Sequence, residues 1–324
     1  MKKLLTFAVS IMLISGMAFG QSVSARGAGN PTDLVPFPNA HSGWFSLDLI
    51  RNTQTLEDDD DDINVNYLNI APSLTYAFSQ KFALKLDLDL TVAGKGLNYP
   101  VVNYDPDEEV YLVSLRKTKY SGFGINNLTV GFIFRTLDAK KGNGNNLNIS
   151  LNLSPAIGKT ELKTSEEEKY KIKPMPNKNM VNLDVAYSKD FNKVSVGGTV
   201  GITYVGKAQN KYTFLGERDT SKLKATMEYN FGTNIQYKDA DQYALTLGIN
   251  YTHHGKLQFD ETSSKLQKAY GQVSTELSAN VKVASNIYTN LSWQHQFDTA
   301  LKDSDGKMGD LSGDLIGLGA TFKF

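Results

Sequence analysis

The chain has 324 residues, no cysteine, and 34 lysines and arginines that balance 34 aspartates and glutamates. A balanced charge gives no general attraction to nucleic acid or to an acidic membrane surface, so we expect no nucleic-acid partner. Without cysteine there is neither a disulfide framework nor a thiol for lipid attachment. The fold must therefore be stable without cross-links.

The first stretch has the pattern of a secretory signal. Two lysines at 2–3 precede an apolar run at 4–17, and small residues flank Phe19 in Ala18-Phe19-Gly20. The run is shorter than the roughly 20 apolar residues that a membrane-spanning helix needs. We predict a signal peptide, a short segment before the main domain, and one main domain, at 1–20, 21–42 and 43–324.

The segment 21–42 cannot be a strand of a regular sheet. Pro31, Pro36 and Pro38 interrupt it, and proline cannot donate to a strand ladder. Its apolar residues, which include Val35 and Phe37, leave two interpretations open. The segment is either a disordered periplasmic tail or a plug that folds into the interior of the following domain.

Alternation of apolar and polar side chains dominates the main domain. In FALKLDLDLTV, at 82–92, Leu84 and Leu86 share one parity while Lys85 and Asp87 share the other. A period of two residues predicts β-strands with two different faces. We expect twelve strands, at 43–54, 63–78, 81–92, 123–136, 146–155, 180–189, 194–205, 221–237, 243–252, 272–283, 286–297 and 313–324.

The connections between these strands alternate between long and short. A soluble antiparallel sandwich also has one apolar and one polar face, but it has no reason to gather its long loops at one end. Outer-membrane barrels have an even number of strands, short periplasmic turns and long extracellular loops. We therefore predict an all-β fold, a single closed antiparallel transmembrane β-barrel of about 12 strands that is integral to the outer membrane.

Aromatic residues on the apolar parity fall at the two ends of the expected strands, as the girdles of a membrane barrel do. Those at the short-turn ends are Tyr76, Phe78, Phe82, Phe134, Tyr187, Tyr237, Tyr243, Phe322 and Phe324. Those toward the long loops are Tyr204, Tyr251, Trp293 and Phe297.

The polar parity would line the lumen with charges of nearly balanced sign. Barrels of eight strands are filled by side chains and those of sixteen to eighteen hold open channels, so about twelve strands predict a narrow lumen. Its interior is either a conduit for small solutes or a hydrogen-bonded, salt-bridged filling that supports the wall. The expected lumen-lining charges are Asp48, Lys85, Asp87, Asp89, Arg135, Asp184, Lys224, Glu228, Glu276, Lys282 and Lys323.

An acidic run stands in the first long loop. Several carboxylates in one loop could bind a hard cation such as Ca²⁺, and the alternative is a solvated acidic tip. The spacing is not that of an EF-hand, and we expect no resident metal or cofactor. The candidate cation-binding residues are Asp58, Asp59, Asp60, Asp61 and Asp62.

The four histidines give no catalytic pattern. His253 and His254 precede Asp260 and Glu261, but neither a GxSxG nor an HExxH motif is present. We interpret His253 and His254 as surface loop residues and place His295 on the lipid-facing parity near the outer rim. We expect no enzymatic activity.

The chain ends in LIGLGATFKF, where Leu318, Ala320, Phe322 and Phe324 share one parity. This end resembles the C-terminal signal strand of Gram-negative outer-membrane barrels, which implies recognition by the barrel-assembly machinery. The overall pattern is similar to the outer-membrane transporters associated with phenol-degradation pathways and, more remotely, to the long-chain fatty acid transporter family. In the latter a glycine-containing N-terminal segment, resembled by SARGAGNPTDLVPF, plugs the lumen.

Two hypotheses for function follow from the sequence. The first is an outer-membrane channel or passive transporter for small hydrophobic or aromatic solutes, surrounded by outer-membrane lipid and lipopolysaccharide. The second is a structural or surface-interaction barrel, such as an adhesin or antigen, that acts through its long loops. Both leave the solute and the oligomeric state open.

Overall fold

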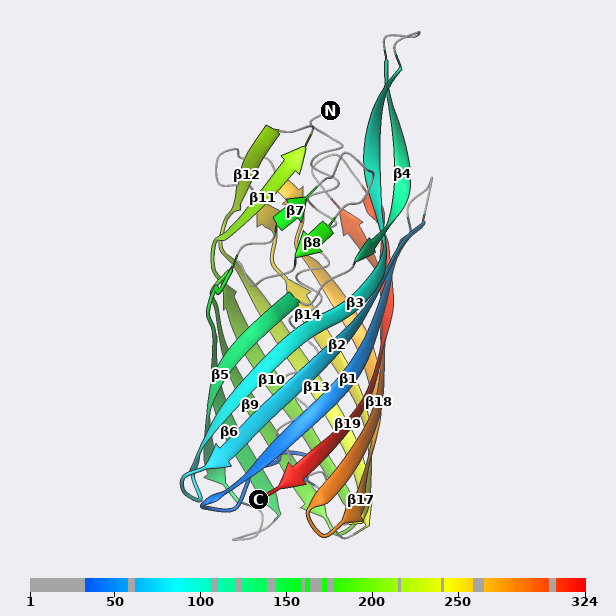
Figure 1. Cartoon of the computed structure of the whole chain (residues 1–324). Helices are drawn as coiled ribbons and strands as arrows, with labels where there is room; N and C mark the ends of the chain where they lie inside the picture. The colour runs from blue at the N-terminus through cyan, green and yellow to red at the C-terminus, as the bar shows by residue number, and fades with distance from the viewer. Residues whose placement is uncertain are drawn as a thin grey trace.

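The computed structural model is a closed antiparallel β-barrel of 12 strands, which confirms the all-β barrel prediction (Figure 1). It describes residues 33–57, 62–105, 110–120, 124–138, 144–158, 161–163, 171–173, 178–214, 217–239, 242–258, 265–302 and 307–324. The barrel strands are β1 (Ser42–Glu57), β2 (Asp62–Ala77), β3 (Phe82–Asp105), β5 (Gly124–Leu137), β6 (Asn145–Ser154), β9 (Met180–Phe191), β10 (Val194–Val205), β13 (Thr226–Asp239), β14 (Tyr243–His254), β17 (Tyr270–Ala284), β18 (Ile287–Lys302) and β19 (Lys307–Lys323).

Each barrel strand pairs with its neighbours in chain order, and β19 closes the ring on β1. The closing ladder runs from Trp44↔Lys323 to Glu57↔Asp310 without a register shift. Closure matters because an open edge would leave backbone N–H and C=O groups without partners in hydrocarbon. Among the described residues, no helix has the length and hydropathy needed to cross a bilayer.

Side chains of the wall divide into two sets by parity. On β3, Leu86 is 43% exposed, whereas the adjacent Lys85 is buried. Large exposed apolar side chains continue around the wall, among them Leu183 on β9, Leu247 on β14 and Leu318 on β19. A wall of exposed leucine has its lowest free energy in hydrocarbon, so this surface faces lipid and the polar parity faces the lumen.

Exposed aromatic side chains form a girdle at each end of the wall, as the sequence predicts. At the periplasmic end the rings contact one another, with the Phe82 and Phe134 centroids 5.2 Å apart. Rings at this height bury their apolar body in lipid and leave their polar groups near water. Tyr229, on β13, adds to the outer girdle of Tyr204, Tyr251, Trp293 and Phe297.

The periplasmic connections that the structure describes in full are tight turns. In the turn between β2 and β3, the Ser79 hydroxyl accepts the backbone N–H groups of Lys81 and Phe82 at 3.2 and 3.1 Å. In the turn between β9 and β10, Asn192 adopts a φ of 54°. Asparagine tolerates this left-handed conformation better than most residues, which suits it to so short a reversal.

Further strands stand beyond the outer rim. The outer part of β3 pairs with β4 (Val110–Tyr120) in a long hairpin that projects above the barrel (Figure 1). A separate sheet has the order β12-β11-β7-β8, built from β12 (Glu217–Leu223), β11 (Ala208–Phe214), β7 (Glu161–Lys163) and β8 (Lys171–Lys173). A short pair joins β15 (Leu257–Gln258) to β16 (Lys265–Gln267).

One expected strand, 221–237, is in fact two. β12 ends at Leu223 and β13 begins at Thr226, so the prediction of a single strand is wrong. The alternation of apolar and polar residues runs through the break, which hides it in the sequence. The break lies at the outer rim, where the chain enters the barrel. Before this point β12 pairs with β11 instead of with a barrel strand.

Candidate functional site

A network of ion pairs and hydrogen bonds lines the lumen side of β2, β3 and β5. Lys85 Nζ lies 2.7 Å from the Asp87 carboxylate, and the Ser73 hydroxyl donates to the same carboxylate at 2.6 Å. Farther toward the outer end, Asn126 Nδ2 donates to Asp89 at 3.3 Å. Each of these charged groups has a partner within the wall, which limits the charge presented to a passing ion.

Asparagine amides hold two further lumen carboxylates. Asn152 and Asn182 donate to Asp184 at 3.3 and 3.1 Å, and Asn290 donates to Asp48 at 2.9 Å. Glycines on the adjacent strands leave room for these two carboxylates. An added Cβ at Gly201 would collide with Asp184, and one at Gly319 would collide with Asp48.

The remaining expected lumen charges lie at different heights. Glu228 is buried near the outer end of β13, Glu276 is half-buried on the inward parity of β17, and the Lys282 ammonium lies 5.9 Å from the Tyr288 ring centroid near the periplasmic end. Lys224 is exposed in the break between β12 and β13, beyond the barrel strands. Lys323 donates to the Tyr288 hydroxyl at 3.1 Å.

The acidic run 58–61 lies outside the described residues, and Asp62 begins β2. Within the described part of the chain, no group of three or more histidine, cysteine or acidic side chains has an arrangement that could hold a metal ion.

The described part of the N-terminal segment, from 33 to the start of β1, packs inside the periplasmic end of the lumen. Phe37 is 4% exposed and forms an apolar cluster with Ala77, Ala83 and Ile133, whose side chains point inward from β2, β3 and β5. The guanidinium of Arg135 lies over the Phe37 ring.

Polar contacts extend the same docking across the lumen. Asn148 on β6 donates to the Pro36 carbonyl at 3.1 Å. Three strands farther around the barrel, on β13, Lys238 lies 3.8 Å from Asp33 and 3.0 Å from Asp190. From these contacts we propose the second interpretation of this segment, a plug.

The outer half of the lumen has an apolar strip on one side. Ile50, Ala71 and Leu315 form a buried cluster across β1, β2 and β19. All three project inward, on the parity that is otherwise mostly polar. Buried apolar side chains continue this strip toward the outer end, on β2, β19 and β18. The apolar strip comprises Ile50, Tyr67, Ala71, Leu301, Leu311 and Leu315.

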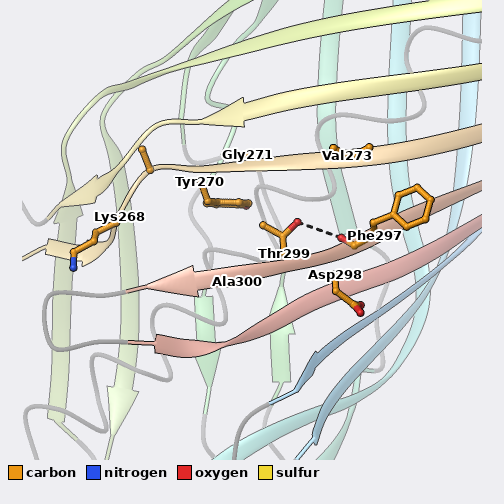
Figure 2. A pocket seen from close by; sticks show the side chains of 9 residues that line it. Lys268, Tyr270, Gly271, Val273, Phe297, Asp298, Thr299 and Ala300 are labelled. Carbon is orange, nitrogen blue, oxygen red and sulfur yellow. Dashed lines mark hydrogen bonds between the residues drawn. The ribbon is translucent and has the colours of Figure 1, made fainter.

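The wall opens beside this strip. The ladder between β17 and β18 stops at Ser274↔Gln296, although β17 starts at Tyr270 and β18 continues to Lys302. The register between β18 and β19 shifts between Gln296 and Thr299. Beyond this shift β18 remains paired with β19 but is separated from β17. A pocket of about 500 Å³ occupies the gap, and Figure 2 shows its lining residues Lys268, Ala269, Tyr270, Gly271, Val273, Phe297, Asp298, Thr299 and Ala300.

Residues from both faces of the wall line this pocket. Val273 and Phe297 belong to the lipid-facing surface, whereas Tyr270 lies on the inward parity of β17. Ala300 lines the pocket and is followed by Leu301, which is fully buried in the apolar strip. The gap, here called the wall pocket, is therefore lined from both faces of the wall, and its residue Ala300 directly precedes Leu301 of the apolar strip.

A triad of side chains, the buried His254 and Glu228 with the half-buried Tyr270, stands next to the wall pocket. His254 is 2% exposed, its Nδ1 lies 3.3 Å from the Glu228 carboxylate, and its ring stacks on Tyr270 with centroids 4.5 Å apart. The interpretation of His254 as a surface loop residue is therefore wrong.

The other two outer histidines face away from the lumen. His253 packs against the outward ring of Tyr229, with centroids 6.2 Å apart. His295 lies on the outer wall as the sequence predicts, where its Nδ1 is 3.0 Å from Asp314.

Sequence reasoning missed His254 and Tyr270 because it ended one strand at residue 252 and began the next at 272. Continuing the alternation by two residues in each strand would have placed both on the lumen side, opposite each other. The structure pairs them directly, His254↔Tyr270.

No protein-family model and no curated protein matches the chain. Among solved structures, the COG4313 outer membrane channel from Pseudomonas putida F1 is similar, with a TM-score of 0.62 and 14% identity over 91% of this chain and 99% of that one. The translocator domain of the autotransporter NalP from Neisseria meningitidis has a TM-score of 0.51 and 8% identity over 96% and 97%. A deletion mutant of the TodX monoaromatic hydrocarbon channel has a TM-score of 0.51 and 8% identity over 94% of both chains.

At these identities the likeness is one of fold, and it agrees with the closed wall, the lipid-facing leucines and the two aromatic girdles. The chain is an integral β-barrel of the outer membrane.

Proposed function

We propose that the protein is a passive outer-membrane channel for small apolar or aromatic solutes. The observation that carries the proposal is the apolar strip inside the outer lumen and the wall pocket that adjoins it. A pore for ions or sugars gains nothing from inward leucine and isoleucine, because such solutes would lose hydration there. An apolar solute gains free energy from the same surface.

The polar part of the lumen supports the same proposal. Charges such as Lys85 and Asp87 are paired with each other, and Phe37 packs inside the periplasmic end of the lumen. A lumen whose charges are paired and whose periplasmic end is filled should conduct ions weakly. Of the similar structures, one is an outer membrane channel and another is a monoaromatic hydrocarbon channel, and the second favours the same class of solute.

The partners expected from the sequence are part of the proposal. The lipid-facing wall would contact outer-membrane lipid, with lipopolysaccharide around the outer girdle. The final strand, β19, which ends with Phe322 exposed on its outer face, would be read by the barrel-assembly machinery.

The test is uptake by Gram-negative cells that lack general porins, because an intact lipopolysaccharide leaflet slows apolar solutes that cross simple bilayers freely. Accumulation of labelled naphthalene and labelled glucose would be compared in cells with and without the protein. We expect faster naphthalene accumulation and unchanged glucose accumulation. Equal naphthalene rates with and without the protein would reject the proposal.

A second candidate function rests on the structure beyond the rim. The β3–β4 hairpin and the β12-β11-β7-β8 sheet project outside the membrane, as an adhesin or antigen requires (Figure 1). Replacing residues 97–118 by a short Gly-Ser turn separates the two functions. Loss of cell adhesion with unchanged naphthalene uptake would favour the surface-interaction barrel.

A further inference from the structure

The Tyr270 ring is held from one side by a stacked imidazole. The two ring planes are inclined by only 19°, with centroids 4.5 Å apart, so the His254 ring covers one face of the tyrosine. The contact follows from the register, since His254 and Tyr270 are directly opposed on the inward faces of β14 and β17. Direct opposition brings two side chains closer than any other pairing in a sheet.

The imidazole is itself fixed. The register of β13 and β14 pairs Tyr229 with His253, which sets Glu228 beside His254, and the Glu228 carboxylate lies 3.3 Å from His254 Nδ1. The other ring nitrogen, Nε2, is buried and has no hydrogen-bond partner among the described residues. A buried nitrogen without a partner lowers stability, so packing alone does not account for a histidine at this position.

The opposite face of Tyr270 looks toward the wall pocket. β17 lies between β14 and β18, so a ring covered by His254 on the β14 side turns its second face toward β18. Figure 2 shows the Tyr270 ring nearly edge-on, between its own strand and Thr299 of β18. The space between Tyr270 and Thr299 belongs to the wall pocket.

We infer that Tyr270 is a selectivity platform, on which planar aromatic solutes stack as they pass through the wall pocket. Glu228 and His254 act as positioning residues that keep the ring flat against its strand. An aromatic solute would extend the stack from His254 through Tyr270, whereas a saturated ring of equal size offers only ordinary van der Waals contact. The inference rests on the proposed channel function and adds the residue that discriminates between solutes.

The discriminating measurement uses two hydrocarbons with the same carbon skeleton, planar naphthalene and saturated decalin. Uptake of each by porin-deficient cells would be measured for the wild type, Tyr270→Leu, Tyr270→Phe and His254→Leu. The ratio of naphthalene uptake to decalin uptake should be about 2- to 10-fold higher in cells with the wild-type protein than in cells without it. One aromatic stacking contact supports a difference of this size.

Each variant has its own expected result. Tyr270→Leu should abolish the preference while decalin uptake stays the same or rises. Tyr270→Phe keeps the ring and should keep the preference. His254→Leu should lower the preference without contact to the solute, because it removes the support behind the ring.

Tyr229→Leu is the matched control. It removes a tyrosine from the same end of the barrel, but from the lipid-facing side, and should leave the preference unchanged. Heat-modifiable electrophoretic mobility would verify that every variant is folded.

The outcomes separate the two proposals. Wild-type uptake of both hydrocarbons at equal enhanced rates, or an undiminished preference in folded Tyr270→Leu, would overturn the platform while leaving the channel function intact. If the protein enhances the uptake of neither hydrocarbon, both proposals are overturned. Should Tyr270→Leu fail to fold, loss of the preference in His254→Leu supports the platform and its persistence rejects it.

Discussion

The guanidinium carbon of Arg135 lies 4.5 Å from the centroid of the Phe37 ring, a contact between the barrel wall and the segment that precedes it. A cation over an aromatic face is attractive, and more so where water is excluded. The same ring packs on Ala77, Ala83 and Ile133, so Phe37 is an apolar anchor of the proposed plug.

Replacing Phe37 with alanine should therefore loosen the plug. Truncation of a buried phenylalanine costs about 3–5 kcal/mol, which is large for so short a segment. We expect the ion conductance of Phe37→Ala in planar bilayers to rise toward that of a variant lacking residues 21–41.

Phe78→Ala serves as the control, because it removes an aromatic ring at the same end of the barrel from the lipid-facing side. Its conductance should match the wild type. A conductance that stays at the wild-type level in both Phe37→Ala and the truncation would show that the segment does not restrict the lumen.

Lys85 and Asp87 form a nearly buried pair, with side chains 8% and 13% exposed. Lys85→Met should destabilise the barrel by about 3–5 kcal/mol, since it leaves the Asp87 carboxylate without its cation in a poorly hydrated site. The double variant Lys85→Met/Asp87→Leu should recover much of this loss. Urea unfolding in phospholipid vesicles measures the three free energies, and a double variant no better than Lys85→Met would contradict the pairing.

The fold could be predicted from sequence because the bilayer imposes a rule on every wall residue. Leu86 and Asp87 are adjacent in the chain and meet different solvents, and that difference repeats along each strand with a period of two. Closure, the girdles and the short turns then follow from the need to satisfy the backbone in hydrocarbon.

The wall pocket could not be predicted in this way. β17 and β18 both continue past Ser274↔Gln296, and nothing in their alternation marks where they part. The separation arises from the register shift near Thr299, which depends on three strands at once. The docking of Phe37 is similarly a long-range effect, because its partners come from three strands far along the chain.

The Lys193–Asp239 pair gives a prediction for alkaline pH. Its atoms lie 2.8 Å apart near the periplasmic turns, and the hydrogen bond and charge of Asp239 raise the pKa of Lys193 above 10.5. A lysine whose pKa is raised on folding stabilises the folded state fully below its unfolded value, and this contribution is lost as pH rises through the folded value.

The expected effect is small because both groups are exposed and salt screens them. We expect Lys193→Met to have a slightly lower urea midpoint than the wild type at neutral pH. The difference should vanish above the raised pKa, and also in about 1 M salt, where the Debye length is about 3 Å. A difference that persists under both conditions would have another origin.

Leu86 tests the assignment of the outer wall to hydrocarbon. It pairs with Leu74 on β2 and Val130 on β5, and all three side chains lie on the outward parity. An arginine at the bilayer midplane of such a barrel costs about 2–4 kcal/mol, and the cost falls to about 0–1 kcal/mol near the interface. Leu86→Arg should therefore destabilise the barrel in vesicles far more than Tyr243→Arg, which stands in the periplasmic girdle. Urea unfolding would measure both, and equal losses at the two depths would mean that this face of β3 does not meet hydrocarbon.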